Sequence, residues 1–188
     1  MVAGSLWPDS SETRSSGSLR SALWRISESA RCAIDAPGPN LRLACEVAVD
    51  VDQLVDIAHD LGHGVMPRDA VSLIERFEHD LLPDWYDEWI ILHRERWRQI
   101  RLHALESLAD VLREAGDWAT ATEAGLAALR ADPLRETAHR VLIQTSLSEG
   151  NRPEALRQYH VYEMTMRDEL GLPPSPEIAA LAGVAVAR

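Results

Sequence analysis

The side chains best suited to chemistry lie on the polar side of residues 18–30. Apolar residues recur there at helical spacing, and between them stand Ser18, Arg20, Ser21 and Arg25. A guanidinium can bind a phosphate or the edge of a guanine, and a serine hydroxyl near the amino end of a helix can donate to a phosphate. These four residues are therefore candidate nucleic-acid contacts. An ordinary solvated helix face has the same composition, so that interpretation stays open.

Two histidines have a spacing that could serve a metal ion. His59 and His63 stand at i and i+4, from which one helix face can bind zinc. No HExxH motif and no nearby cysteine pair completes a site, and we expect no metal.

Four aromatic side chains lie close together in the sequence: Trp85, Tyr86, Trp89 and Trp97. They could form an aromatic box for a ligand. Trp85 and Trp89 share a helical face, however, and large aromatics at this spacing more often anchor a core. We expect packing.

No arrangement of residues indicates an enzyme. The sequence contains no evident nucleophile beside a base, no glycine-rich phosphate loop and no carboxylate constellation. Acidic residues alternate with arginines, as in Arg94-Glu95-Arg96, which is typical of solvent-exposed helix faces. We therefore expect neither catalysis nor a cofactor.

The elements before residue 50 are a lead-in, a helix and a hairpin. Residues 1–17 are rich in serine with little apolar periodicity, which predicts a flexible or partly ordered lead-in before the helix over 18–30. Short runs at 31–34 and 41–44 flank a turn with Gly38 and Pro39 at its tip. In this register Asp35 faces Arg42, a favourable pair of opposite charges.

The same register places Cys32 opposite Cys45. Two cysteines are too few for a disulfide framework, and they form no CxxC pair. A cross-strand redox pair is the alternative, but free thiols in a reducing compartment are expected.

Helices are predicted for almost all of the remaining chain. Glycine and proline separate apolar periodic segments, which lie at 52–61, 68–82, 87–115, 118–131, 134–148 and 153–170.

An offset of 34 residues recurs within these helices. Gly116 and Ala121 return as Gly150 and Ala155, and 34 residues is the period of the tetratricopeptide helical hairpin. The same offset relates Ala104, Leu108 and Ala109 to Ala138, Leu142 and Ile143. Glycine can end a helix in the left-handed conformation, and alanine suits a close helix crossing. Chance agreement is the alternative. Stacked hairpins usually present a concave surface that binds another protein.

Composition and charge limit the classes of function. The 188 residues are 46% hydrophobic and 26% charged, which is ordinary for a globular protein, and all 19 basic side chains are arginine. The net charge of −11 argues against binding nucleic acid with the whole surface, so such a contact must be local. Neither a secretory signal nor a membrane span is evident, and we expect a cytoplasmic protein.

Three strings carry a family likeness: LLPDWYDEW at 81–89, DPLRETAHR at 132–140 and DELGLPP at 168–174. Together they resemble the bacterial transcriptional activator domain of Streptomyces antibiotic regulatory proteins. The resemblance covers about residues 48–182. It implies a tetratricopeptide-like activator domain over residues 51–182, followed by a tail at 183–188.

The strings LWPD at 6–9 and SLRSALWRI at 18–26 resemble the end of the winged-helix DNA-binding domain that precedes this activator domain in the family. Residues 18–50 would then hold the recognition helix and a wing, with Arg31 and Arg42 as further DNA contacts. The leading strands and first helix of that domain would lie before Leu6, so we expect a partial winged helix. The expected fold is mainly α.

The resemblance implies a DNA-binding transcriptional activator of antibiotic secondary metabolism. Its winged helix would contact promoter DNA, its repeats would recruit RNA polymerase, and it would bind direct repeats as a homodimer. The alternative is a truncated interaction module that does not bind DNA and competes for polymerase or for a full-length relative.

Overall fold

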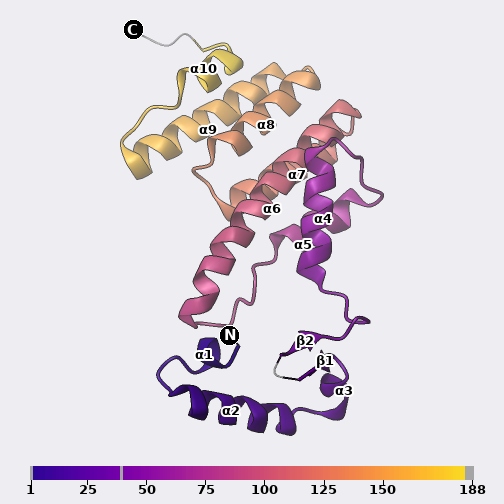
Figure 1. Ribbon diagram of the computed structural model, residues 1–188. Coiled ribbons are helices and arrows are strands. Elements are labelled where there is room, and N and C mark those ends of the chain that lie inside the picture. Colours follow the sequence, from indigo (N-terminus) through magenta and orange to yellow (C-terminus); the bar gives the residue numbers. More distant parts are fainter. Residues whose placement is uncertain (1, 39, 185–188) are drawn as a thin grey trace. The chain divides into compact units, whose positions relative to one another are not determined.

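Helices dominate the computed structural model, which describes residues 2–38 and 40–184. Within these residues the only β-structure is one two-stranded sheet. The prediction of a mainly α fold is therefore confirmed. The chain divides into two units, residues 1–53 and 54–188 (Figure 1).

The first unit holds short helices and the sheet: α1 (Val2–Leu6), α2 (Glu12–Arg25), α3 (Glu28–Arg31), β1 (Ile34–Asp35) and β2 (Arg42–Leu43). α1 packs against α2. α4 (Asp50–Gly62) begins at the end of this unit and continues into the second.

α2 begins earlier than predicted. The expectation of a flexible lead-in over residues 1–17 is wrong for residues 2–6 and 12–17, which are helical. Ser11 is the N-cap residue in an extended conformation, and Glu12 places a carboxylate in the first turn, where the helix dipole favours it. The buried Ser15 donates to the Glu12 carbonyl at 3.1 Å. Serine is a weak helix former, so packing against α1 outweighs local propensity here.

α2 also ends earlier than predicted. The expected helix over 18–30 stops at Arg25, and Ile26 is extended. The Ser27 hydroxyl then accepts a hydrogen bond from the Ala30 N–H at 3.2 Å and caps the separate helix α3.

The hairpin has the expected register. Ile34 pairs with Leu43 and Asp35 with Arg42, whose guanidinium lies 3.1 Å from the Asp35 carboxylate. Both cysteines are exposed free thiols. Gly38 has a φ of 70°, a left-handed conformation that suits a turn, whereas Pro39 lies outside the described residues.

The second unit continues with α5 (Ala70–Glu78), α6 (Glu88–Glu114), α7 (Trp118–Ala131), α8 (Glu136–Ser148), α9 (Arg152–Leu170) and α10 (Pro176–Ala182). From α6 to α9 each helix packs against the next, α5 packs on α6 and α7, and α10 packs on α8 and α9 (Figure 1). α10 follows a break that the sequence predicts at residues 171–176, although no bounds were predicted for this helix. The unit is thus a stack of helical hairpins.

The two hairpins α6–α7 and α8–α9 turn in the same way. Gly116 and Gly150 have φ of 82° and 85°, conformations in which glycine alone avoids a side-chain clash. The N–H of the following residue, Asp117 or Asn151, donates back to the helix that ends, at 2.9 and 2.8 Å. The same residue's side-chain oxygen caps the next helix. One turn design is therefore used twice, 34 residues apart.

Small residues set the distance between the paired helices. Ala121 and Ala155 are fully buried. On α7, a Cβ atom added to Gly125 would lie 2.7 Å from the Leu142 Cδ2 atom on α8, so the Leu142 side chain packs directly on the α7 backbone at this point. Side-chain volume at these positions controls how the hairpins stack.

Candidate functional site

The four candidate contacts of α2 do not share one face. Ser18, Ser21 and Arg25 line an open groove of about 750 Å³ together with Trp7. Arg20 is exposed and does not line this groove. Arg20 and Arg25 therefore present their guanidinium groups on different sides of α2.

One reason for choosing the serines was wrong. They were expected near the amino end of a helix, where unpaired N–H groups favour phosphate. Because α2 begins at Glu12, Ser18 and Ser21 lie in its middle and carboxyl-terminal turns. Only their hydroxyl groups remain for a contact.

The two arginines of the expected wing already have partners. Arg31 donates to the carbonyls of Trp24 and Ile26 at 3.1 and 3.3 Å, so it caps the end of α2. Arg42 donates through two nitrogens to Asp35 but keeps 68% of its side chain exposed. Neither is a free cation, although Arg42 is accessible.

The positive charge of the first unit is concentrated on α2. This helix carries three arginines and one glutamate. Over residues 1–53, by contrast, seven carboxylates outnumber five arginines. An approaching polyanion would therefore meet positive charge on α2 and little elsewhere on this unit.

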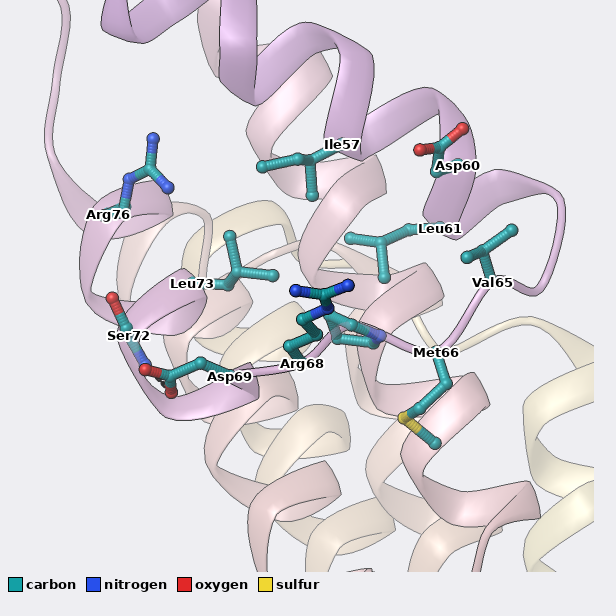
Figure 2. Close-up of a pocket in the computed structure, with 11 residues that line it drawn as sticks. Ile57, Asp60, Leu61, Val65, Met66, Arg68, Asp69, Ser72, Leu73 and Arg76 are labelled. Carbon is teal, nitrogen blue, oxygen red and sulfur yellow. Dashed lines mark hydrogen bonds between the residues drawn. The ribbon is translucent and has the colours of Figure 1, made fainter.

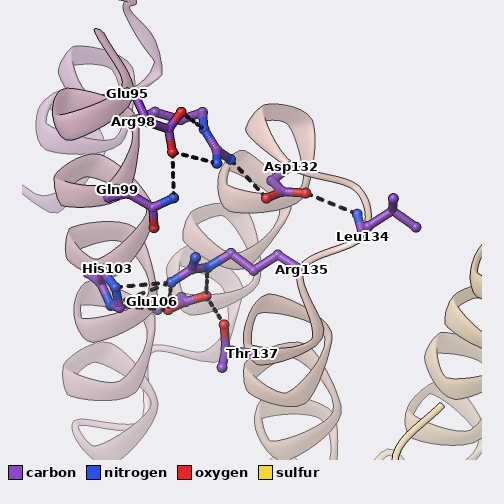
Figure 3. A network of polar contacts seen from close by, with 9 residues as sticks. All are labelled: Glu95, Arg98, Gln99, His103, Glu106, Asp132, Leu134, Arg135 and Thr137. Carbon is purple, nitrogen blue, oxygen red and sulfur yellow. Dashed lines mark hydrogen bonds and ion pairs between the residues drawn. The ribbon is translucent and has the colours of Figure 1, made fainter. Parts of the chain in front are cut away.

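Two ion pairs join the repeats of the second unit. Figure 3 shows Arg98 of α6 reaching Asp132, and Arg135 reaching back to Glu106 of α6. The nitrogen–oxygen distances are 2.9 and 2.6 Å. Thr137 adds a hydrogen bond of 2.5 Å to Glu106. Arg135 and Glu106 are almost buried, so loss of one partner would leave an uncompensated charge in the interior.

Glu136 connects α8 to the segment before α10. Its carboxylate accepts hydrogen bonds from the Ser175 hydroxyl at 2.5 Å, the Ser175 N–H at 3.2 Å and the Tyr162 hydroxyl at 3.2 Å, and it pairs with Arg140. Burial would raise the pKa of this carboxyl, but the hydrogen bonds outweigh burial and lower it. Burial and the Glu136 charge raise the pKa of Tyr162 to about 12.

His139 is a neutral core residue. Its Nε2 atom lies 2.9 Å from the Pro133 carbonyl, and its Nδ1 atom lies 2.9 Å from the Gln158 amide, so Nε2 carries the proton and Nδ1 accepts. The ring packs on Tyr162 with centroids 4.3 Å apart. Burial lowers the pKa of His139.

The aromatic segment divides into a buried and an exposed part. Trp97 is buried, stacks on Phe77 and donates to the His79 carbonyl at 3.0 Å. Trp85 and Tyr86 are 43% and 87% exposed. Trp89 is half-buried, and Trp85 meets it edge to face with ring centroids 5.9 Å apart. The expected packing therefore applies to Trp97 and to the Trp85–Trp89 pair, but not to Tyr86.

Arg94 holds this exposed segment in place. Its guanidinium donates to the carbonyls of Leu81, Leu82 and Trp85. Leu82 has a φ of 46°, which is uncommon for a residue with a side chain. Ile91 and Leu92 on the first turns of α6 are 59% and 80% exposed. We refer to the exposed apolar residues at this end of α6 together as the α6 patch: Leu82, Trp85, Tyr86, Ile91 and Leu92.

The histidine pair forms no larger cluster. The Nε2 atoms of His59 and His63 lie 3.2 Å apart and the rings meet edge to face. In the part of the chain that the structure describes, no group of three or more His, Cys, Asp or Glu side chains could hold a metal ion. A membrane-spanning helix is likewise absent from the described residues.

The stacked hairpins define a helical-repeat scaffold of the kind that binds other macromolecules. Residues 66–183 match the family model described as bacterial transcriptional activator domain. This match covers more than half of the chain, and the chain belongs to that family. The match begins later than the expected domain, which started at residue 51.

A solved structure has a similar fold. It is EmbR of Mycobacterium tuberculosis in complex with a low-affinity phosphopeptide, with a TM-score of 0.67 and 18% sequence identity. The likeness covers 96% of this chain and 52% of EmbR, so the chain spans about half the length of that protein. At 18% identity the similarity shows a shared fold only. Among curated proteins none matches the chain by sequence.

The structure shows the roles of several residues in the strings at 132–140 and 168–174. Asp132, Arg135 and Glu136 hold α6, α8 and the start of α10 together. Gly171 ends α9 with a φ of 68°. The sequence revealed these residues only through the resemblance, because the partners that join them to α6 and to the start of α10 lie 29 to 39 positions away.

Proposed function

We propose that this chain is a DNA-binding transcriptional activator of the antibiotic regulatory type. α2 and the hairpin contact promoter DNA, and the helical repeats contact the transcription machinery. The observation that carries the proposal is the match of residues 66–183 to the bacterial transcriptional activator domain. The first unit, which contains α2, precedes this domain in the sequence.

Arg20 and Arg25 are the residues that we assign to DNA. Both are exposed on α2, and neither has a side-chain partner among the described residues. Each contact with a phosphate would release counterions, so affinity should fall steeply with salt. Arg42 is a secondary candidate because it would have to leave or share Asp35.

The α6 patch is the surface that we assign to the transcription machinery. Exposed aromatic and aliphatic side chains grouped in this way are typical of protein interfaces. The Arg94 hydrogen bonds keep the segment ordered, which lowers the entropy cost of binding.

A mobility-shift assay tests the DNA contact. The full chain is titrated onto DNA from upstream of its neighbouring genes, and compared with Arg20→Gln/Arg25→Gln. The matched control is Arg157→Gln/Arg167→Gln, two exposed arginines of α9 with the same change in charge. We expect the α2 variant to bind about tenfold or more weakly, with a shallower salt slope, and the control to bind normally.

The second candidate is an interaction module that does not bind DNA. It is favoured by the internal partners of Arg31 and Arg42 and by the acidic balance of the first unit. A chain that captures RNA polymerase but leaves every promoter fragment unshifted at low salt would support this candidate.

A further inference from the structure

A pocket of about 440 Å³ lies between α4, α5 and the loop that joins them, and it shares no residue with α2 or the α6 patch (Figure 2). Its volume is in the range of small-molecule sites. Most of its wall is apolar and consists of Ile57, Leu61, Val65, Met66, Pro67 and Leu73.

Ser72 and four charged side chains complete the lining; the charged ones are Asp60, Arg68, Asp69 and Arg76. Asp69 is already used, because its carboxylate accepts the Ser72 N–H at 3.0 Å and caps α5. Figure 2 draws Asp60 and Arg76 on opposite sides of the pocket. Arg68 lies between them near the middle of the pocket, and Asp69 lies beside Ser72 on the side of Arg76.

The two arginines of the lining, Arg68 and Arg76, are unpaired within the described part of a chain that is rich in carboxylates. Elsewhere in this unit Arg98, Arg113 and Arg135 each bind a carboxylate. Among the residues that the structure describes, neither Arg68 nor Arg76 has a hydrogen-bond or ion-pair partner for its side chain. Two guanidinium groups beside an apolar wall leave room for an anion to pair with them.

We infer that this pocket binds a small organic anion with an apolar body. The anionic group pairs with Arg68 and Arg76, and the apolar body lies against Leu61 and Leu73. Asp60 repels the anion from the opposite edge and so fixes the orientation of the ligand. This function is additional to DNA and polymerase binding, because the pocket residues belong to neither proposed surface.

A fluorescent anion provides the test. Anilinonaphthalene sulfonate has an aromatic body and one sulfonate, and its emission rises in an apolar site. Its binding to the full chain is compared with that of N-phenylnaphthylamine, which has the same aromatic body without the charge. We expect the sulfonate to bind at least fivefold more tightly than the neutral probe.

Variants locate the site. Arg68→Gln and Arg76→Gln should each weaken binding of the sulfonate about threefold to tenfold and leave the neutral probe unchanged. Arg157→Gln/Arg167→Gln is the control for total charge. Circular dichroism must show intact helices in each variant, since this probe also binds partly unfolded chains.

Two results would overturn the inference. One is equal binding of the charged and neutral probes to the unmodified chain. The other is sulfonate binding that survives both arginine substitutions. Neither result bears on the mobility-shift assay, so the two proposals fail separately.

Discussion

Single residues of the second unit hold helices that are distant in sequence, and Glu136 shows this most clearly. One carboxylate joins α8, α9 and the segment before α10 through Arg140, Tyr162 and Ser175. Its pKa is lowered in the fold. The ionised form therefore stabilises the protein above the ordinary pKa of 4.5, and this contribution is lost as the pH falls through the lower folded value.

Replacement of Glu136 by glutamine should destabilise the protein by about 1–3 kcal/mol at pH 7. The amide keeps the size of the side chain but cannot accept at both oxygen positions. Urea unfolding measures the effect, with Glu149→Gln, an exposed residue at the end of the same helix, as control. Equal midpoints for the two variants would contradict this role.

His139 should also make the protein less stable as the pH falls, but in a higher pH range than Glu136. Its pKa is lowered in the fold, so the unfolded chain binds a proton more readily below the ordinary value of 6.5. Stability therefore falls as the pH drops below that value. In His139→Gln, whose amide can donate to Pro133 and accept from Gln158, the loss of stability between pH 7 and pH 5.5 should be smaller than in the unmodified chain. An unchanged slope would argue against the assignment.

At the scale of elements, the hairpin repeat was predictable because its signals are local. Gly116 and Gly150 end helices, and α7 has the predicted bounds. α10 also has local signals from which its start could have been predicted, since Ser175 caps it and Pro176 follows at its first position. α2 was misjudged because tertiary packing of a serine-rich segment leaves no periodic pattern. The ion pair between Arg135 and Glu106 depends on how helices stack, which the sequence does not state.

Enlarging the alanines at the helix crossings tests the repeat. Ala121→Leu and Ala155→Leu should each cost about 1–3 kcal/mol, because both sites are fully buried. Ala119→Leu and Ala180→Leu are matched controls at exposed helical positions. If both buried variants unfold at the same temperature as the unmodified chain, the main support for this packing is lost.

At the scale of the whole molecule, we propose different functions for the two units. The acidic net charge of −11 is compatible with DNA binding only if the contact is local, on α2 and the hairpin. The hairpin stack, by contrast, belongs to a transcriptional activator family and carries an exposed apolar patch. The sequence was sufficient to select the candidate DNA contacts by residue type. Only the structure shows that they are distributed over two sides of α2.

The most direct measurement is run-off transcription with RNA polymerase from the source organism on promoters near the gene. The account predicts that the full chain increases transcript from at least one of them. Tyr86→Ala/Leu92→Ala should lose this increase while still shifting the DNA, and Arg20→Gln/Arg25→Gln should lose both. Met164→Ala, an exposed apolar residue of α9, is the control. A chain that folds, yet neither shifts these promoters nor changes their transcription, would contradict the account.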